Sequence, residues 1–298
     1  MTRGRYTRPV TSGTRHLVLI AGALALLGSV AFALLDAFFP DGERAVGSAE
    51  SQAAGRAELE QMMETYGTLA AVQQNGALLG LIEDEWSPLF ASFSYWPEPS
   101  ARVDFAAAPA PLGYRARFAF SSGERWGVDG EPWVVEHGLP VPDSPKRFRA
   151  GYAGVETPRL LFLPFSVALE GASVVLHRRG DVSSGRPHVL SVRFRKPNRG
   201  PSFTAEWRLY VDPGSHRLLE VVLEQTAISD APILVRCRAE GLLEASGISL
   251  VERYRCAISN RLEVPLFERT LRSPSFKPVT PGMFAPQRRE APGGVQPG

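Results

Sequence analysis

The sequence predicts an α+β fold: an antiparallel β-sheet that makes up most of one exported domain, a few helices, and one N-terminal transmembrane helix. Three observations lead to this prediction. A segment near the N-terminus is apolar and uncharged, later parts of the chain alternate between apolar and polar residues, and short turns separate these alternating runs. With 298 residues, of which 44% are hydrophobic, the chain can bury a sizeable core in one large domain or two small ones.

The predicted transmembrane helix runs from Leu17 to Leu35. These 19 residues include no charged side chain, and as a helix they would extend about 28 Å, close to the ~30 Å thickness of the hydrocarbon core. Every charged residue before them is an arginine, whereas Asp36 follows them directly. Because positive flanks stay in the cytoplasm, we expect the N-terminus inside and the rest of the chain outside.

A cleaved signal peptide is the alternative to a retained signal anchor. Ala31-Phe32-Ala33 resembles a cleavage site, but the apolar stretch is longer than the ~7–15 residues of a signal-peptide core. We expect a single-pass protein of the inner (cytoplasmic) membrane, attached through residues 17–35, with its C-terminal domain in the periplasm or outside the cell. If the segment is cleaved, the protein is secreted.

Composition divides the chain into segments, and the main body is nearly neutral. A nucleic-acid binder normally carries a basic face on a basic domain, so we expect no nucleic-acid partner. The predicted segments are a basic cytoplasmic segment (1–16), the transmembrane signal anchor (17–35), a linker (36–50), the β-rich domain (51–284) and a flexible tail (285–298).

Strands are predicted where apolar and polar residues alternate. Phe203, Trp207 and Leu209 share one face of such a run, and the turn residues 212–215 precede a second alternating run, which together predict a hairpin. Residues 128–131 mark another hairpin turn, between Trp126 and Trp133. Further two-faced runs cover residues 114–120, 172–177, 189–195, 233–240 and 248–258. Strands joined by short turns favour one antiparallel meander over a parallel sheet.

Helices are predicted in three places. Leu59, Met62 and Tyr66 fall on one stripe of a helix that ends at a glycine, and residues 69–81 are expected to add a second helical piece, interrupted at Asn75-Gly76, before the strand pattern begins near Asp84. The segment 145–169 breaks the strand pattern, which predicts a helix or a lid-like excursion across the sheet.

The two cysteines are a candidate disulfide. Cys237 and Cys256 lie on the apolar faces of two predicted strands, and a two-residue turn at Ser246-Gly247 would place them directly opposite each other. A bridge suits an oxidising exported compartment. Against it, this register makes them a hydrogen-bonded pair, in which side chains lie farther apart unless a bulge intervenes. Two buried thiols are the alternative.

No motif in the sequence indicates catalysis. The five histidines form no metal-binding spacing, and we find no nucleophile elbow, phosphate-binding loop or dinucleotide-binding glycine pattern. We therefore predict no catalytic residue, no metal and no cofactor, and a protein that is not an enzyme.

Aromatic and aliphatic residues of the predicted sheet and of the 145–169 segment are the candidate ligand contacts. They could line an apolar cavity, or they could be ordinary core, because a sheet face must be covered whether or not a ligand is present. The candidates are Phe118, Phe120, Trp126, Trp133, Phe162, Phe165, Trp207, Leu209, Leu219 and Val221.

Four short runs resemble the LolA-like superfamily of periplasmic lipoprotein carriers, and more closely an exported branch of it. They are residues 127–133 (GVDGEPW), 161–165 (LFLPF), 192–194 (VRF) and 207–218 (WRLYVDPGSHRL), the last being the most specific. The resemblance covers roughly residues 55–262. It implies a strongly curved half-barrel sheet with helices against its concave side, and an apolar cavity between them that holds a lipid acyl chain.

These observations lead to one functional hypothesis and two alternatives. We expect a membrane-anchored periplasmic protein that binds a lipid or another hydrophobic ligand in the half-barrel cavity and catalyses no reaction. The first alternative is an envelope interaction or stress-sensing module that recognises a protein partner. The second is an exported hydrolase whose site residues are dispersed in the sequence.

Overall fold

A computed structural model of the chain describes residues 47–110, 113–142, 145–194, 206–225, 233–258 and 263–286. All of them belong to one compact unit, residues 44–298. The predicted transmembrane helix and most of the predicted tail lie outside the described residues. Within the described ranges, no helix is long and apolar enough to cross a membrane.

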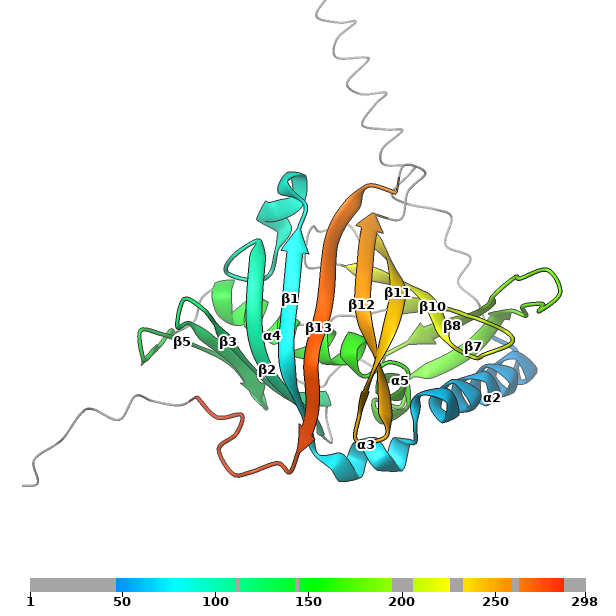
Figure 1. The fold of residues 1–298 in the computed structure, drawn as a ribbon, viewed down its shortest axis with the longest axis horizontal. Helices are drawn as coiled ribbons and strands as arrows, with labels where there is room; N and C mark the ends of the chain where they lie inside the picture. The colour runs from blue at the N-terminus through cyan, green and yellow to red at the C-terminus, as the bar shows by residue number, and fades with distance from the viewer. Residues whose placement is uncertain are drawn as a thin grey trace, which may run out of the picture. The chain divides into compact units, whose positions relative to one another are not determined.

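The described strands form one antiparallel sheet of 13 strands (Figure 1). Its order is β6-β5-β4-β3-β2-β1-β13-β12-β11-β10-β9-β8-β7, so the first and last strands of the chain pair in its middle. The bounds are β1 Ala77–Trp86, β2 Ser100–Ala110, β3 Gly113–Phe120, β4 Arg125–Asp129, β5 Glu131–Glu136, β6 Leu139–Pro140, β7 Ser173–Arg178, β8 His188–Arg193, β9 Glu206–Val211, β10 Leu218–Gln225, β11 Ile233–Ala245, β12 Ile248–Ile258 and β13 Pro265–Lys277.

Along the chain, helices α2 and α3 precede the first strand, and α4 and α5 come between β6 and β7. In Figure 1, α4 and α5 lie behind the central strands, and α2 lies beside β7. Their bounds are α2 Ala49–Tyr66, α3 Leu69–Asn75, α4 Pro145–Leu161 and α5 Phe165–Leu169, with a short 3₁₀ helix, η1, at Pro88–Phe93. The predicted helix ending at Gly67 and the helical excursion in 145–169 are confirmed.

The inner face of the sheet, defined as the face that packs against α4 and α5, carries a continuous apolar row. Its members are directly opposite one another from strand to strand, so side-chain alternation places all of them on one face. From β1 to β7 the row reads Trp86, Phe267, Cys256, Cys237, Val221, Leu209, Leu190 and Leu176. This row and its neighbours form the core.

The expected helical piece 69–81 is wrong in its second half. The helix ends at Asn75, because Gly76 has a φ of 83° that favours glycine, and the apolar run that follows pairs with both β2 and β13 as strand β1. A short apolar run fits a buried strand as well as a helix.

Two central strands were not among the predicted ones, β2 and β13. Pro274 argued against a strand at the C-terminal end, because proline cannot donate to a sheet ladder. On the β1 side, Pro274 falls at an irregularity in the pairing, where Ser273 has a φ of 47°. On the β12 side, the pairing of β13 ends at Thr270, before Pro274. Pro274 therefore leaves no gap in the ladder to β12.

Helix α2 begins at an N-cap and approaches the sheet closely. The Ser48 side chain accepts a hydrogen bond from the backbone of Ser51, which satisfies one of the free N–H groups of the first turn. Farther along, Gly55 faces the backbone of Val175 and Leu176 in β7. A Cβ at position 55 would lie 2.8 Å from the Leu176 nitrogen, so glycine sets how near the helix lies.

Candidate functional site

Most of the predicted ligand contacts lie on the inner face or on the helices that cover it, and they are buried. Their exposed fractions are 0–1%, except for Phe120, which is partly buried. The structure thus brings together Phe118, Phe120, Trp126, Phe162, Phe165, Trp207, Leu209 and Val221, in two neighbourhoods on either side of the central strands.

An aromatic cluster forms the first neighbourhood, on strands β3 and β4. Trp96, which follows η1, packs against Phe118, Phe120 and Trp126 with ring centroids 5.2, 5.5 and 6.1 Å apart. Edge-to-face contacts of this kind add to the area that the rings bury. Trp96 is a contact that the sequence analysis did not include among the candidate residues.

The second neighbourhood lies on β8, β9 and β10. Trp207 packs against Phe194 with ring centroids 4.9 Å apart, and Leu209 is directly opposite Val221. The Nε1 of Trp207 is buried and has no hydrogen-bond partner among the described residues. Around Trp207, Leu209 and Val221 the side chains of the inner face are therefore apolar, and the guanidinium of Arg159 lies 4.4 Å from the Phe194 ring centroid.

Two candidates, Trp133 and Leu219, lie on the opposite, outer face. Trp133 lies over Gly127 and donates from Nε1 to the carbonyl of Phe284 at 3.0 Å, under the segment that follows β13. Leu219 is 43% exposed, because a register irregularity between Leu218 and Glu220 turns it outward. Simple alternation along these strands misplaced both side chains.

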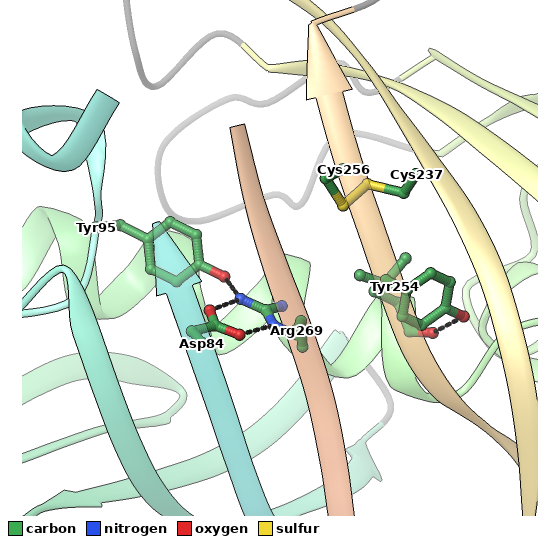
Figure 2. Close-up of a disulfide and its surroundings, with 7 residues drawn as sticks. Asp84, Tyr95, Cys237, Tyr254, Cys256 and Arg269 are labelled. Carbon is green, nitrogen blue, oxygen red and sulfur yellow. Dashed lines mark hydrogen bonds and ion pairs between the residues drawn. A yellow bond between two sulfur atoms is a disulfide. The ribbon is translucent and has the colours of Figure 1, made fainter. Parts of the chain in front are cut away.

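The cysteines of the inner face form a disulfide, with their Cα atoms 4.0 Å apart (Figure 2). The pairing register is the expected one, with Cys237 opposite Cys256 and the turn at Ser246-Gly247. Between turn and bridge, Gly241 has a φ of 67° and is missing from the ladder. The register is the same on both sides of Gly241, so no bulge intervenes and the disulfide forms in the pair type that counted against it.

A buried charge pair connects the centre of the inner face to the helices. Asp84 of β1 accepts a hydrogen bond from Nε of Arg269 in β13 at 2.7 Å, and the two side chains are 0% and 2% exposed. Arg269 also donates to the Tyr95 hydroxyl (Figure 2), and Trp96 Nε1 donates to Asp84. Arg269 reaches Thr157 of α4 at 3.5 Å. Burial lowers the pKa of Arg269, but the charges and hydrogen bonds of Asp84 and Tyr95 together outweigh this effect, so the net pKa is raised.

A second buried charge cluster holds α4 to α5. Arg159 donates to Glu156 at 2.8 Å and to both carboxylate oxygens of Glu170 at 2.7 and 2.6 Å. Burial raises the pKa of Glu156, against the opposing effect of Arg159. Tyr114 lies nearby, and burial raises the pKa of its hydroxyl well above the ordinary value, with the charge of Glu170 adding to this effect.

A third cluster fixes α2 to the sheet. Glu58 is 7% exposed, and its two oxygens lie 2.9 Å from Nδ1 of His216 and 3.6 Å from Nε2 of His188. Nδ1 of His188 accepts from the backbone of Gly180 at 2.7 Å, which leaves the proton of the neutral ring on the nitrogen that faces Glu58. In the part of the chain that the structure describes, no group of three His, Cys, Asp or Glu residues is arranged to hold a metal.

The hollows at the surface lie away from the aromatic cluster. One, of about 600 Å³, is lined by residues of β1, β11, β12 and β13, and a second, of about 410 Å³, lies over the outer face of β1, β2 and β13. Neither is lined by Phe118, Trp126 or Trp207. Around Phe118, Trp126 and Trp207, which are 0–1% exposed, the inner face is closed in this structure.

None of the three charge clusters was predicted from the sequence. Asp84 and Arg269 are 185 residues apart, so no local spacing joins them. One signal was available: Asp84 falls between Ile82 and Trp86 at strand spacing, and a carboxylate on an otherwise apolar strand face needs a buried partner. The Glu58 cluster leaves no such signal, because its histidines come from a strand start and a turn.

Comparison with solved structures identifies the architecture. A LolA superfamily protein, NE2245 from Nitrosomonas europaea, superposes with a TM-score of 0.50 at 11% identity, over 78% of this chain and 97% of that one. The fold is LolA-like. A DUF1329 family protein from Desulfovibrio piger (TM-score 0.49, 9% identity, 77% and 96% covered) and a domain assigned to outer membrane lipoprotein sorting from Vibrio parahaemolyticus (0.48, 11%, 78% and 97%) are similar to a lesser degree. No protein-family model and no curated protein sequence matches the chain.

Proposed function

We propose that this protein binds a lipid or another hydrophobic ligand between the inner face of its sheet and helices α4 and α5, as a half-barrel carrier or receptor that catalyses no reaction. The observation that carries the proposal is the apolar row across the inner face, from Trp86 in β1 to Leu176 in β7. An acyl chain gains about 0.8 kcal/mol for each buried CH₂ group on such a surface.

Binding at this face requires α4 and α5 to separate from the sheet. Phe118, Trp126 and Phe162 are 0–1% exposed, so the closed form has no room for an acyl chain there. Arg269 connects α4 to the sheet through Thr157, a polar contact in the middle of an apolar layer. This contact is one long hydrogen bond of 3.5 Å, and the ion pair of Arg269 with Asp84 lies within the sheet, so α4 can separate from the sheet without breaking that ion pair.

The buried carboxylates support a binding role over catalysis. A dispersed hydrolase site needs a carboxylate with a shifted pKa that faces open space and a second polar group. Burial raises the pKa of Glu156 and of Glu220. Both are already engaged, Glu156 by Arg159 and Glu220 by Arg236 at 3.2 Å, and neither lines the two hollows.

Photolabelling tests the proposal by location. The full chain, purified in an amphipathic polymer and freed of lipid, is mixed with a diazirine-bearing palmitate, and the adducts are mapped by peptide mass spectrometry. We expect adducts on inner-face strands, around Leu209 and Val221, and not around the outward Leu219. Labelling confined to the outer face or to residues 17–35 contradicts the proposal.

The protein-partner alternative gives the opposite result. Crosslinking in the cell envelope that captures a protein, from a chain whose inner face takes up no palmitate, would replace the lipid-binding proposal. The attachment to the inner membrane through residues 17–35 and the periplasmic location are part of the proposal, and they are tested by fractionation and by labelling of a single introduced cysteine from either side of the membrane.

A further inference from the structure

The 600 Å³ hollow has the size and the mixed lining of a small-molecule site. Ligand pockets in proteins span about 300–1,000 Å³ and combine apolar walls with a few polar groups. Its apolar lining residues are the exposed Pro88 and Pro265, the half-buried Ala257, and the buried Trp86, Leu266 and Phe267. Trp86 stacks on Phe267 with ring centroids 4.7 Å apart, so the wall is rigid on that side.

The charged part of the lining is ordered by sign. On the outer face, Arg238 of β11 is directly opposite Arg255 of β12, and Glu268 of β13 is directly opposite Glu85 of β1. Arg255 is in turn opposite Glu268. The row therefore places two cations side by side and then two anions side by side. Like charges directly opposite each other destabilise a sheet, so this order costs stability in the protein alone.

The ion pairs around this row still allow Arg238, Arg255 and Glu85 to bind a ligand. Arg238 bonds both oxygens of Glu263 at 3.1 Å, and Arg255 lies 3.1 Å from Glu268. The Arg238 and Arg255 side chains are 58% and 54% exposed, and exposed pairs contribute about 0–1 kcal/mol, so a ligand anion can replace a carboxylate partner. Glu85 is exposed and has no ion pair or hydrogen bond among the described residues.

Trp86, which lines the hollow, also has an unused donor. The Nε1 of Trp86 is buried and has no hydrogen-bond partner among the described residues. A buried donor without an acceptor is costly, and it is more often found where a ligand or a water completes the site.

We propose that this hollow binds a zwitterionic amphiphile. Its anionic group, a phosphate or carboxylate, bonds Arg238 and Arg255, its ammonium group bonds Glu85, and its apolar chain lies against Trp86, Pro88 and Leu266. A ligand with both charges matches the order of the row. A purely anionic ligand is repelled by the two glutamates, and a purely cationic one by the two arginines. Trp86, Phe267 and Cys256 of the inner-face row also line this hollow. The inference still does not rest on the proposed function, because the groups that select the ligand, Glu85, Arg238 and Arg255, lie on the outer face.

The test compares three probes of one chain length, each with a diazirine in the chain and each below its micelle concentration. They are dodecyl phosphoethanolamine, dodecyl phosphate and dodecylamine, added to the full chain in an amphipathic polymer. One charged contact at an exposed rim contributes up to about fivefold in affinity. We expect the zwitterion to label the hollow's peptides about fivefold more than either singly charged probe.

Variants separate the two halves of the site. Glu85→Gln should reduce zwitterion labelling to the level of dodecyl phosphate, and the double variant Arg238→Gln with Arg255→Gln should reduce it to the level of dodecylamine. Glu83→Gln is the matched control, because Glu83 lies two residues away on the same face of β1 and does not line this hollow; it should change nothing.

Equal labelling by the three probes, adducts away from this hollow, or an effect of Glu83→Gln as large as that of Glu85→Gln would each overturn the inference. Because palmitate labelling of the inner face is measured separately, loss of one site leaves the result for the other intact.

Discussion

Removing Asp84 should destabilise the protein more than any exposed charge substitution. In Asp84→Ala, the guanidinium of Arg269 stays 2% exposed, with the Tyr95 and Thr157 hydroxyls but no carboxylate. An uncompensated buried charge costs about 3–5 kcal/mol, a large part of the ~5–15 kcal/mol that holds a domain folded. We expect a loss of this size in the free energy of unfolding, measured by urea titration with circular dichroism.

Two comparisons make this prediction specific. Glu83→Ala removes a neighbouring carboxylate that is 42% exposed and pairs with Arg272, so it should cost no more than about 1 kcal/mol. Replacing both charges by apolar residues, Asp84→Leu with Arg269→Met, should cost less than Asp84→Ala alone, because no charge remains buried. The reasoning is refuted if Asp84→Ala costs under about 1 kcal/mol, or if the double variant is the less stable of the two.

Three further predictions test other parts of the fold. Gly55→Ala should destabilise the protein by about 1–3 kcal/mol in urea unfolding, since the new methyl would lie 2.8 Å from the β7 backbone. At an unobstructed helix position the same substitution would stabilise by about 0.5–1 kcal/mol, so a gain in stability would contradict the close approach. Cys237 and Cys256 are 19 residues apart, and reducing their disulfide should lower the free energy of unfolding by about 3 kcal/mol. The same reductant should not change the stability of a double Cys→Ala variant. An unchanged urea midpoint on reduction would argue against a stabilising disulfide. Burial raises the pKa of Glu156, so between the ordinary pKa of 4.5 and the raised pKa the folded state binds more protons than the unfolded state. The free energy of unfolding should therefore fall as the pH rises through that window. Glu156→Gln should flatten this slope in urea titrations, and an unaltered slope would show that another group causes it.

The sequence was sufficient to predict much of the sheet. Alternating runs and turn residues identified β3, β4, β5 and β7 to β12, and the two-residue turn at Ser246-Gly247 fixed the register of the cysteines. These features are local, because a turn and a two-residue period are set by neighbours in the chain.

The remaining strands depend on distant contacts. Residues 77–81 are apolar on both sides because the segment after β13, with Met283 and Phe284, packs against Ala77 and Leu79, so they lack the alternation of a half-buried strand. β13 contains Pro274, which only the irregular pairing with β1 accommodates. The residues of β1 and β13 do not by themselves indicate which distant strand each one pairs with.

The candidate site was predictable in composition but not in detail. Apolar strand faces indicated Phe118, Trp126 and Leu209 correctly as inward side chains. Leu219 and Trp133 were misplaced because a register irregularity and the tight β4–β5 turn decide which face they occupy. The closure of the inner face by α4 depends on glycines 151 and 154, which allow the helix to lie against β5 and β4 and which carry no pattern of their own.

Stapling α4 to the sheet tests most directly whether a ligand binds beneath it. A Cβ at Gly151 would lie 3.3 Å from the Cβ of Pro132 in β5, close to the ~3.5–4.5 Å of a disulfide, so Gly151→Cys with Pro132→Cys can be bridged by oxidation. The readout is inner-face labelling by diazirine-bearing palmitate, with each single cysteine variant and the reductant-treated natural chain as controls. We predict that the bridge abolishes this labelling and that reduction restores it. Equal labelling of the bridged and the reduced protein would contradict ligand binding between the helix and the sheet.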